Sequence, residues 1–96
     1  MSADPKPLEI THDRANTVFL ATVDGHECEL DYRLEGKTMV ITHTGVPEPV
    51  AGRGIANLLT RKAVDVACHN GWKIHPACSY AVRWFERNTE YKNLLV

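Results

Sequence analysis

The sequence THTGVPEPVAGRGIA, residues 42–56, carries the strongest structural signal in the chain. It ends a β-branched apolar run, passes two glycines two residues apart, Gly52 and Gly54, and leads at once into an amphipathic pattern. Glycine lets the backbone turn its N–H groups toward a ligand, and the unpaired amides at the start of a helix favour a phosphate. Arg53 lies in the loop and offers a charge-assisted contact. The stretch predicts a strand, a phosphate-binding loop and a helix.

A second interpretation of the same glycines is that they only make a tight connection between a strand and a helix. The loop lacks the Gly-Lys-Ser/Thr ending of a Walker A motif, and it is not the full GxGxxG fingerprint of dinucleotide-binding folds. Both of those phosphate-binding classes are excluded by pattern. The glycine spacing alone leaves open the choice between a ligand loop and a plain connection.

The residues after the loop follow helical spacing. Apolar side chains recur one turn apart from Ile55 to Ala67, and Asn70-Gly71 supplies a helix stop. Residues 72–75 predict a short strand limited by Pro76, and residues 80–88 predict a second helix with an aromatic inner face. A strand, a helix and another strand in this order make a βαβ unit, so the strands on either side of the long helix should be parallel.

The first half of the chain alternates as strands do. We expect strands at residues 8–12, 17–23, 28–34 and 38–44, with the dipeptide Asp24-Gly25 suited to a tight hairpin and a further turn at residues 35–37. These four strands predict an antiparallel meander. With the second half added, the expected fold is α/β: a mixed, mostly antiparallel five-stranded sheet with a long helix after the fourth strand and a shorter helix after the fifth.

Length and composition bound the class of protein. Ninety-six residues, 44% hydrophobic and 24% charged, indicate one globular domain. We expect that domain at residues 8–96, after a disordered lead-in at residues 1–7. A net charge of −1 gives no reason to expect nucleic acid, and no apolar run has the ~18–20 residues that a membrane span needs.

The cysteines indicate the compartment and bear on metal binding. Three cysteines at unrelated spacings predict no disulfide framework, and reduced thiols without an export signal suggest the cytoplasm. His75 and Cys78 are two candidate zinc ligands, but a tetrahedral site needs two more at recognisable spacing. We therefore expect no metal.

On these residues the chain resembles the GCN5-related N-acetyltransferases (GNATs), most closely the small YjdJ-type or NATD-type acetyltransferase domains. Residues 46–56 look like the acyl-CoA pyrophosphate loop of that family, whose pattern is Arg/Gln-x-x-Gly-x-Gly/Ala. A His-Thr-x-Val-Pro run precedes the loop at residues 43–47, and a Cys-x-Tyr follows the next strand at residues 78–80. The resemblance extends from Leu8 to Tyr91.

The resemblance implies a GNAT-like sheet, acetyl-CoA as the cofactor, and transfer of its acetyl group to an amine acceptor that the sequence does not name. It also implies which residues bind acetyl-CoA: Thr44, Val46, Ala51, Gly52, Arg53, Gly54, Ile55, Ala56 and Asn57. Two positions depart from the family pattern. Ala51 stands where the family usually has Arg or Gln, and Gly45 stands where many relatives have Glu, a usual candidate for the general base.

Three further residues are candidates for the chemistry. Cys78 either accepts the acetyl group or contacts the thioester, and Tyr80 donates a proton to the departing CoA thiolate; the alternative for both is packing. His43 is a candidate base in place of the absent Glu, since histidine exchanges protons near neutral pH, or it is a strand residue without a role. A rival function for the whole chain is a non-catalytic acyl-CoA-binding module.

Overall fold

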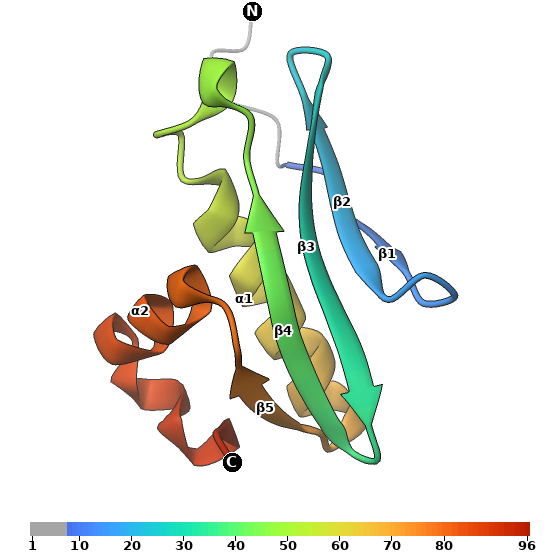
Figure 1. The fold of residues 1–96 in the computed structure, drawn as a ribbon, viewed down its shortest axis with the longest axis vertical. Helices are drawn as coiled ribbons and strands as arrows, with labels where there is room; N and C mark the ends of the chain where they lie inside the picture. Colours follow the sequence, from blue (N-terminus) through green and yellow to red (C-terminus); the bar gives the residue numbers. More distant parts are fainter. Residues whose placement is uncertain (1–7) are drawn as a thin grey trace, which may run out of the picture.

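A five-stranded sheet organises residues 8–96, the part of the chain that the computed structural model describes (Figure 1). The predicted lead-in at residues 1–7 lies outside the described residues. The elements, in chain order, are β1 (Thr11–Asp13), β2 (Val18–Val23), β3 (His26–Glu35), β4 (Thr38–Gly45), the 3-10 turn η1 (Glu48–Val50), α1 (Ile55–Asn70), β5 (Lys73–Pro76), α2 (Ser79–Arg87) and the 3-10 helix η2 (Thr89–Leu94).

The sheet has the order β1-β2-β3-β4-β5, antiparallel up to β4 and parallel between β4 and β5. The predicted mixed sheet, with a long helix after the fourth strand and a shorter one after the fifth, is confirmed. Asp24 and Gly25 form the β2–β3 hairpin with φ of 49° and 77°, as a two-residue turn of this kind requires.

The first strand differs from the prediction. The alternation predicts it at residues 8–12, but β1 spans only Thr11–Asp13, because the turn that follows sets its register. Asp13 accepts hydrogen bonds from the backbone and side-chain nitrogens of Asn16, at 3.2 and 2.9 Å, and Thr17 adopts a φ of 51°. The chain then returns so that Thr11 pairs with Leu20. The sequence pattern does not predict the two 3-10 segments.

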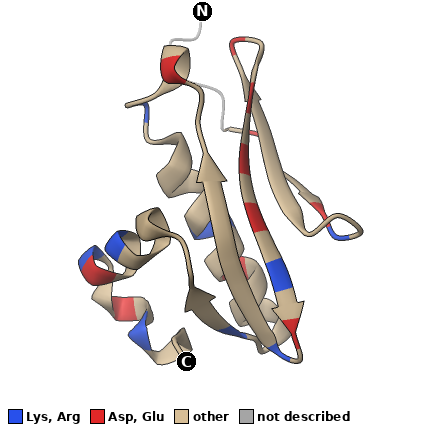
Figure 2. Ribbon diagram, viewed as in Figure 1, with Lys and Arg blue, Asp and Glu red and all other residues tan. Residues whose placement is uncertain are grey.

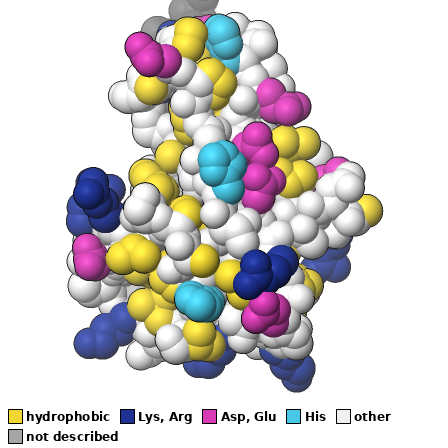
Figure 3. All heavy atoms as spheres, in the orientation of Figure 1, with side chains coloured by type: hydrophobic (Ala, Val, Ile, Leu, Met, Phe, Trp, Pro, Cys, Tyr) yellow, Lys and Arg dark blue, Asp and Glu magenta, His cyan; other side chains and the backbone are white. Residues whose placement is uncertain are grey.

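The two faces of the sheet differ. Helix α1 packs behind the sheet against β2–β5, while α2 lies beside β4 and β5 (Figure 1). The inner face supplies most of the core with fully buried side chains, among them Phe19, Leu30, Met39, Ile41 and Ile74. The opposite face carries charged groups of β3 (Figure 2) and is accessible to solvent over much of its area (Figure 3). No helix among the described residues is long and apolar enough to cross a membrane.

Strands β4 and β5 separate after Ile41. Their register runs from Thr38↔Lys73 to Ile41↔Pro76, and Pro76 has no N–H with which to continue the ladder. The backbone nitrogens of Ala77 and Cys78 both donate to the carbonyl of Ile41, at 2.9 and 3.1 Å, and this ends the pairing. Within residues 8–96, the part of β4 after Ile41 therefore has no strand neighbour on that side.

A β-bulge lies at the same level on the other side of β4. Tyr32 pairs with Ile41, but Asp31 pairs with His43, so Thr42 is the extra residue. The Thr42 hydroxyl donates to the carbonyl of Asp31 at 3.3 Å. Because side chains alternate along a strand, the bulge turns His43 to the outer face and Thr44 to the inner one.

Candidate functional site

The glycine loop runs from the end of β4 to the start of α1. Val50, in η1, is buried and ties the loop to the core. Gly52 and Gly54 adopt left-handed φ values of 81° and 76°, and Gly54 is the N-cap of α1. Glycine takes this conformation without the steric cost that a Cβ brings. The two glycines thus set the path along which the loop enters the helix.

The backbone amides of residues 52–57 gather at this helix start. The first amide to be satisfied inside the helix is that of Leu58, which donates to the carbonyl of Gly54 at 3.1 Å, and no described side chain caps α1. Among residues 8–96, no backbone or side-chain acceptor from elsewhere in the fold bonds to the amides of residues 52–57. Free amides at the positive end of a helix of 16 residues suit an anion such as a phosphate.

A cavity of about 310 Å³ opens beside these amides. Its walls bring together the end of β4, the loop, the first turn of α1 and the first turn of α2. They are mainly apolar and are formed by Val46, Ala51, Gly52, Gly54, Ile55, Ala56, Asn57 and Tyr80. The sequence predicts all of these residues for the site, Tyr80 as a catalytic residue and the others as cofactor contacts.

Tyr80 lines this cavity from the first turn of α2. Burial, as the main cause, raises the pKa of its phenol; the negative charge that Cys78 can carry acts in the same direction, while Arg87 and the Thr60 hydroxyl oppose it. Tyr80 is therefore kept protonated at neutral pH and is available as a hydrogen-bond or proton donor.

Two predicted cofactor residues have other partners here. The Arg53 guanidinium forms an ion pair with Asp24 of the β2–β3 turn at 2.6 Å, and both side chains are more than half exposed. The Asn57 side-chain oxygen accepts from the Trp84 indole nitrogen at 2.7 Å, which links the first turn of α1 to α2. Asn57 can therefore serve the loop through its backbone amide while its side chain holds the two helices together.

Cys78 lies where β4 and β5 separate and is the N-cap of α2. Its Sγ accepts from the backbone nitrogen of Ala81 at 3.4 Å and lies 3.6 Å from the hydroxyl of Thr44. The side chain is half-buried, and a helix N-terminus favours a negatively charged group. Two of the predicted residues, Thr44 and Cys78, therefore meet across the gap between the strands.

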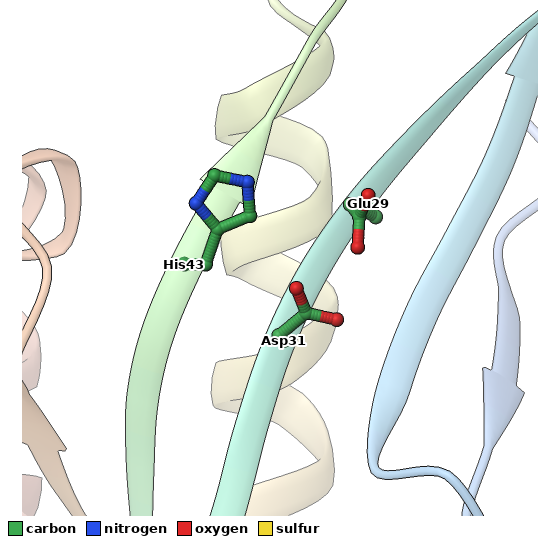
Figure 4. Close-up of side chains that lie close together, drawn as sticks. All are labelled: Glu29, Asp31 and His43. Atoms are coloured by element: carbon green, nitrogen blue, oxygen red, sulfur yellow. The ribbon is translucent and has the colours of Figure 1, made fainter.

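His43 lies apart from the cavity, on the outer face of the sheet. Figure 4 shows its ring beside two carboxylates of β3, Glu29 and Asp31. One potential ligand or proton-carrying atom from each of the three residues lies within 4.8 Å of the others. Sequence reasoning missed both carboxylates. The alternation of residues 28–34 predicts that Glu29 and Asp31 share the polar face of their strand. Their proximity to His43 depends on the bulge, which the alternation does not predict.

The carboxylates interact with each other as well as with His43. A shared hydrogen bond with Asp31 is the main cause that raises the pKa of Glu29, and partial burial and the charges of Asp31 and Glu27 act in the same direction. The charge of His43 opposes them. Two carboxyl groups so close cannot both ionise freely, so Glu29 holds a proton more readily than an isolated glutamate.

Among the described residues, the candidate zinc ligands His75 and Cys78 do not belong to any group of three possible metal ligands. The group that does bring three such side chains together is Glu29, Asp31 and His43. A structural zinc site takes four ligands, and exposed acidic groups are common without an ion.

Comparison with known proteins places this geometry in a family. Residues 18–94 match the family model described as GCN5-related N-acetyl-transferase. The chain is 34% identical over 85 residues to Protein NATD1 of Homo sapiens, an alignment that covers 85% of this chain and 75% of that protein. It is 34% identical over 91 residues to Protein NATD1 of Xenopus tropicalis, with coverage of 91% and 84%.

A solved structure shares the fold. The NMR solution structure of a GCN5-like protein from Staphylococcus aureus superimposes with a TM-score of 0.74 at 28% identity, covering 93% of this chain and 88% of that one. The family match and the structural similarity both cover most of the described residues. The chain belongs to the GCN5-related N-acetyltransferases.

Proposed function

We propose that this protein binds acetyl-CoA at the glycine loop and transfers the acetyl group to an amine. The observation that carries the proposal is the cavity beside the start of α1, where free backbone amides and an apolar wall lie together. The amides suit the pyrophosphate, and the gap between β4 and β5 leads from the loop toward Cys78 and Thr44. A thioester is already activated, so alignment of a neutral amine accounts for much of the catalysis.

The residues proposed for acetyl-CoA are those predicted from the sequence, with two refinements. Asn57 contributes its amide rather than its side chain, because the side chain is bonded to Trp84. Arg53 exchanges its ion pair with Asp24 for the phosphates, at little cost because that pair is exposed. Ala51 is exposed at the end of η1 and has no charged or hydrogen-bonding side chain, so affinity rests mainly on the backbone amides.

Titration with acetyl-CoA, followed by backbone amide shifts, tests the binding site. The largest shifts are expected from Val46 to Asn57. Gly54→Val should weaken binding at least ~10-fold, about 1.4 kcal/mol, because a Cβ disfavours the φ of 76° that aims the amides. Gly36→Val is the matched control, since Gly36 has a φ of 62° in the β3–β4 turn. Largest shifts on the β2–β3 hairpin, or equal losses in both variants, would contradict the assignment.

A non-catalytic acyl-CoA-binding module is the second candidate, favoured by Gly45, which leaves the end of β4 without a carboxylate of its own. The two functions differ in turnover. Release of free CoA thiol from acetyl-CoA in the presence of small primary amines supports transfer, whereas binding without release supports the module.

A further inference from the structure

The outer face of the sheet holds a cluster that the acetyl-CoA site does not account for. Glu29, Asp31 and His43 gather there from two strands, at the level where β4 leaves β5 (Figure 4). We propose that Glu29, assisted by His43, is the general base for acetyl transfer and that, with Asp31, it receives a protonated primary amine. The inference rests on the proposed function and names the acceptor class and a catalytic residue for it.

The position of the cluster supports this role. His43 precedes Thr44, whose hydroxyl lies 3.6 Å from Cys78, so the cluster and Cys78 flank the same short segment of β4 from its two faces. An acyl group lying in the gap beside this segment has Cys78 on the inner side and the cluster on the outer side. An amine that crosses the outer face from the β3 side passes Glu29 and then His43 before it reaches the gap.

The space beside Gly45, which is the cross-strand partner of Glu29, also fits the role. A Cβ at position 45 would lie 3.0 Å from the His43 Nε2 and 3.7 Å from the Glu29 Cγ. The absence of a side chain at Gly45 therefore leaves room for the imidazole and the carboxylate side by side. The bulge at Thr42 aligns the strands in this way, since without it His43 would face the core.

The charge of this face suits an amine acceptor. An alkylamine has an ordinary pKa of about 10.4 and arrives as an ammonium, which must lose a proton before its nitrogen can attack. Carboxylates attract an ammonium, and β3 carries Glu27, Glu29 and Asp31 on this face (Figure 2). A general base works best when its pKa approaches the working pH. The raised pKa of Glu29 shifts it in that direction, with Asp31, Glu27 and His43 as the charged groups around it.

The transfer begins when the ammonium gives one proton to the Glu29 carboxylate and the neutral nitrogen forms a bond to the thioester carbonyl carbon. The C–S bond breaks, its electron pair leaves on the CoA sulfur, and the second proton from the amine nitrogen goes to that sulfur. Glu29 then releases its proton to water. The products are an amide, CoA thiol and one proton, so atoms and charge balance.

Glu29→Gln tests the assignment with two acceptors. With Nα-acetyl-lysine amide, which arrives charged, kcat should fall ~100-fold, the ordinary loss of a general base. With trifluoroethylamine, which is already neutral at neutral pH, the fall should be much smaller. The acidic limb of the wild-type pH–rate profile should disappear, and the acetyl-CoA affinity from the amide titration should not change. Glu86→Gln removes an exposed carboxylate on α2 that has no part in this cluster, and it should keep the wild-type rate.

Shortening the carboxylate gives a second test. In Glu29→Asp a carboxylate remains on the same strand position, and kcat with the lysine derivative should stay ~10-fold or more above that of Glu29→Gln. Rates within about threefold of wild type in Glu29→Gln, or equal losses with both amines, would overturn the assignment of the base while leaving the proposed function intact. Wild-type protein that fails to bind acetyl-CoA overturns the proposed function instead. Binding without turnover of either amine overturns both transfer and this inference.

Discussion

Cys78 shows how one residue can be located from sequence while its chemistry depends on neighbours. The Cys-x-Tyr motif places it after the fifth strand, and the structure shows its sulfur at the N-terminus of α2, half-buried and close to the Thr44 hydroxyl. The other two cysteines have different surroundings. Cys28 is buried in the core, where burial raises the pKa of its thiol, and Cys68 is exposed on α1. Of the three, Cys78 is the one that combines access with a helix N-terminus.

If Cys78 accepts the acetyl group before the amine does, incubation with acetyl-CoA alone should add one acetyl mass to the protein. Intact-mass spectrometry should show the adduct in a variant in which Cys28 and Cys68 are replaced by Ala, and should not show it in Cys78→Ala. Cys78→Ser should lose most of the transfer rate, because a serine hydroxyl ionises far less readily than a thiol.

Direct transfer makes the opposite prediction for the same variants. Full turnover by Cys78→Ala with an added amine would eliminate the covalent route and leave Cys78 as a packing residue beside the pantetheine. The amine would then attack the thioester itself, with Glu29 and His43 as the groups that take its proton. An adduct that forms on Cys68 alone would reflect the exposure of that thiol rather than the site.

Among the elements, α1 and α2 are linked next to the glycine loop by a partly buried hydrogen bond. Trp84 is 1% exposed, and its indole nitrogen donates to the Asn57 side chain at 2.7 Å. Its ring also stacks on Tyr91 of η2, with centroids 5.5 Å apart. Because Asn57 belongs to the first turn of α1, the position of the C-terminal segment is coupled to the turn that presents amides to the cavity.

Asn57→Ala should therefore lower the free energy of unfolding by about 1–3 kcal/mol, since it leaves the buried indole N–H without a partner. In Asn57→Ala/Trp84→Phe the unpaired donor is gone as well, so the double variant should lose less than the sum of the two single variants. Urea unfolding of the four proteins measures the coupling. Strict additivity would mean that the hydrogen bond contributes no coupling between the helices.

The strands show where sequence reasoning succeeds and where it stops. The alternation in residues 28–34 predicts β3, and the helical spacing after Ile55 predicts α1. Burial of one face makes apolar residues recur every two positions in a strand and every three to four in a helix. The bulge at Thr42 leaves no such trace, and regular alternation would place His43 with Met39 and Ile41 on the inner face. The glycine loop and Cys78 could be located from local motifs, whereas the proximity of the β3 carboxylates to His43 could not, because it depends on the register of two strands.

At the scale of the whole molecule, one face of the sheet builds the core and the other is exposed over β3 and β4. A single long helix covers the inner face, and within residues 8–96 no helix covers the outer face over β3 and β4 (Figure 1). In a chain of 96 residues this arrangement gives a large open approach to the gap between β4 and β5.

His12 packs against neighbouring side chains at the β1 edge of the sheet. Its Nε2 lies 2.6 Å from the Tyr32 hydroxyl, and its ring stacks on Phe19 with centroids 4.2 Å apart. Burial lowers the pKa of His12 below the ordinary value of 6.5; Arg14 and Lys62 act in the same direction, and Asp13 opposes them. The folded protein thus favours the neutral ring.

This pKa shift predicts how stability depends on pH. Below about pH 6.5 the unfolded chain binds a proton at His12 that the folded chain resists, so the free energy of unfolding should fall as the pH drops from about 7.5 to about 5.5. Glu29, whose pKa is raised, favours the folded state in the lower part of this range, so the wild-type slope alone is not decisive. His12→Gln has no group to titrate and can still reach Tyr32. Urea midpoints should fall less steeply with decreasing pH in that variant, and parallel curves for the two proteins would show that His12 does not couple folding to pH.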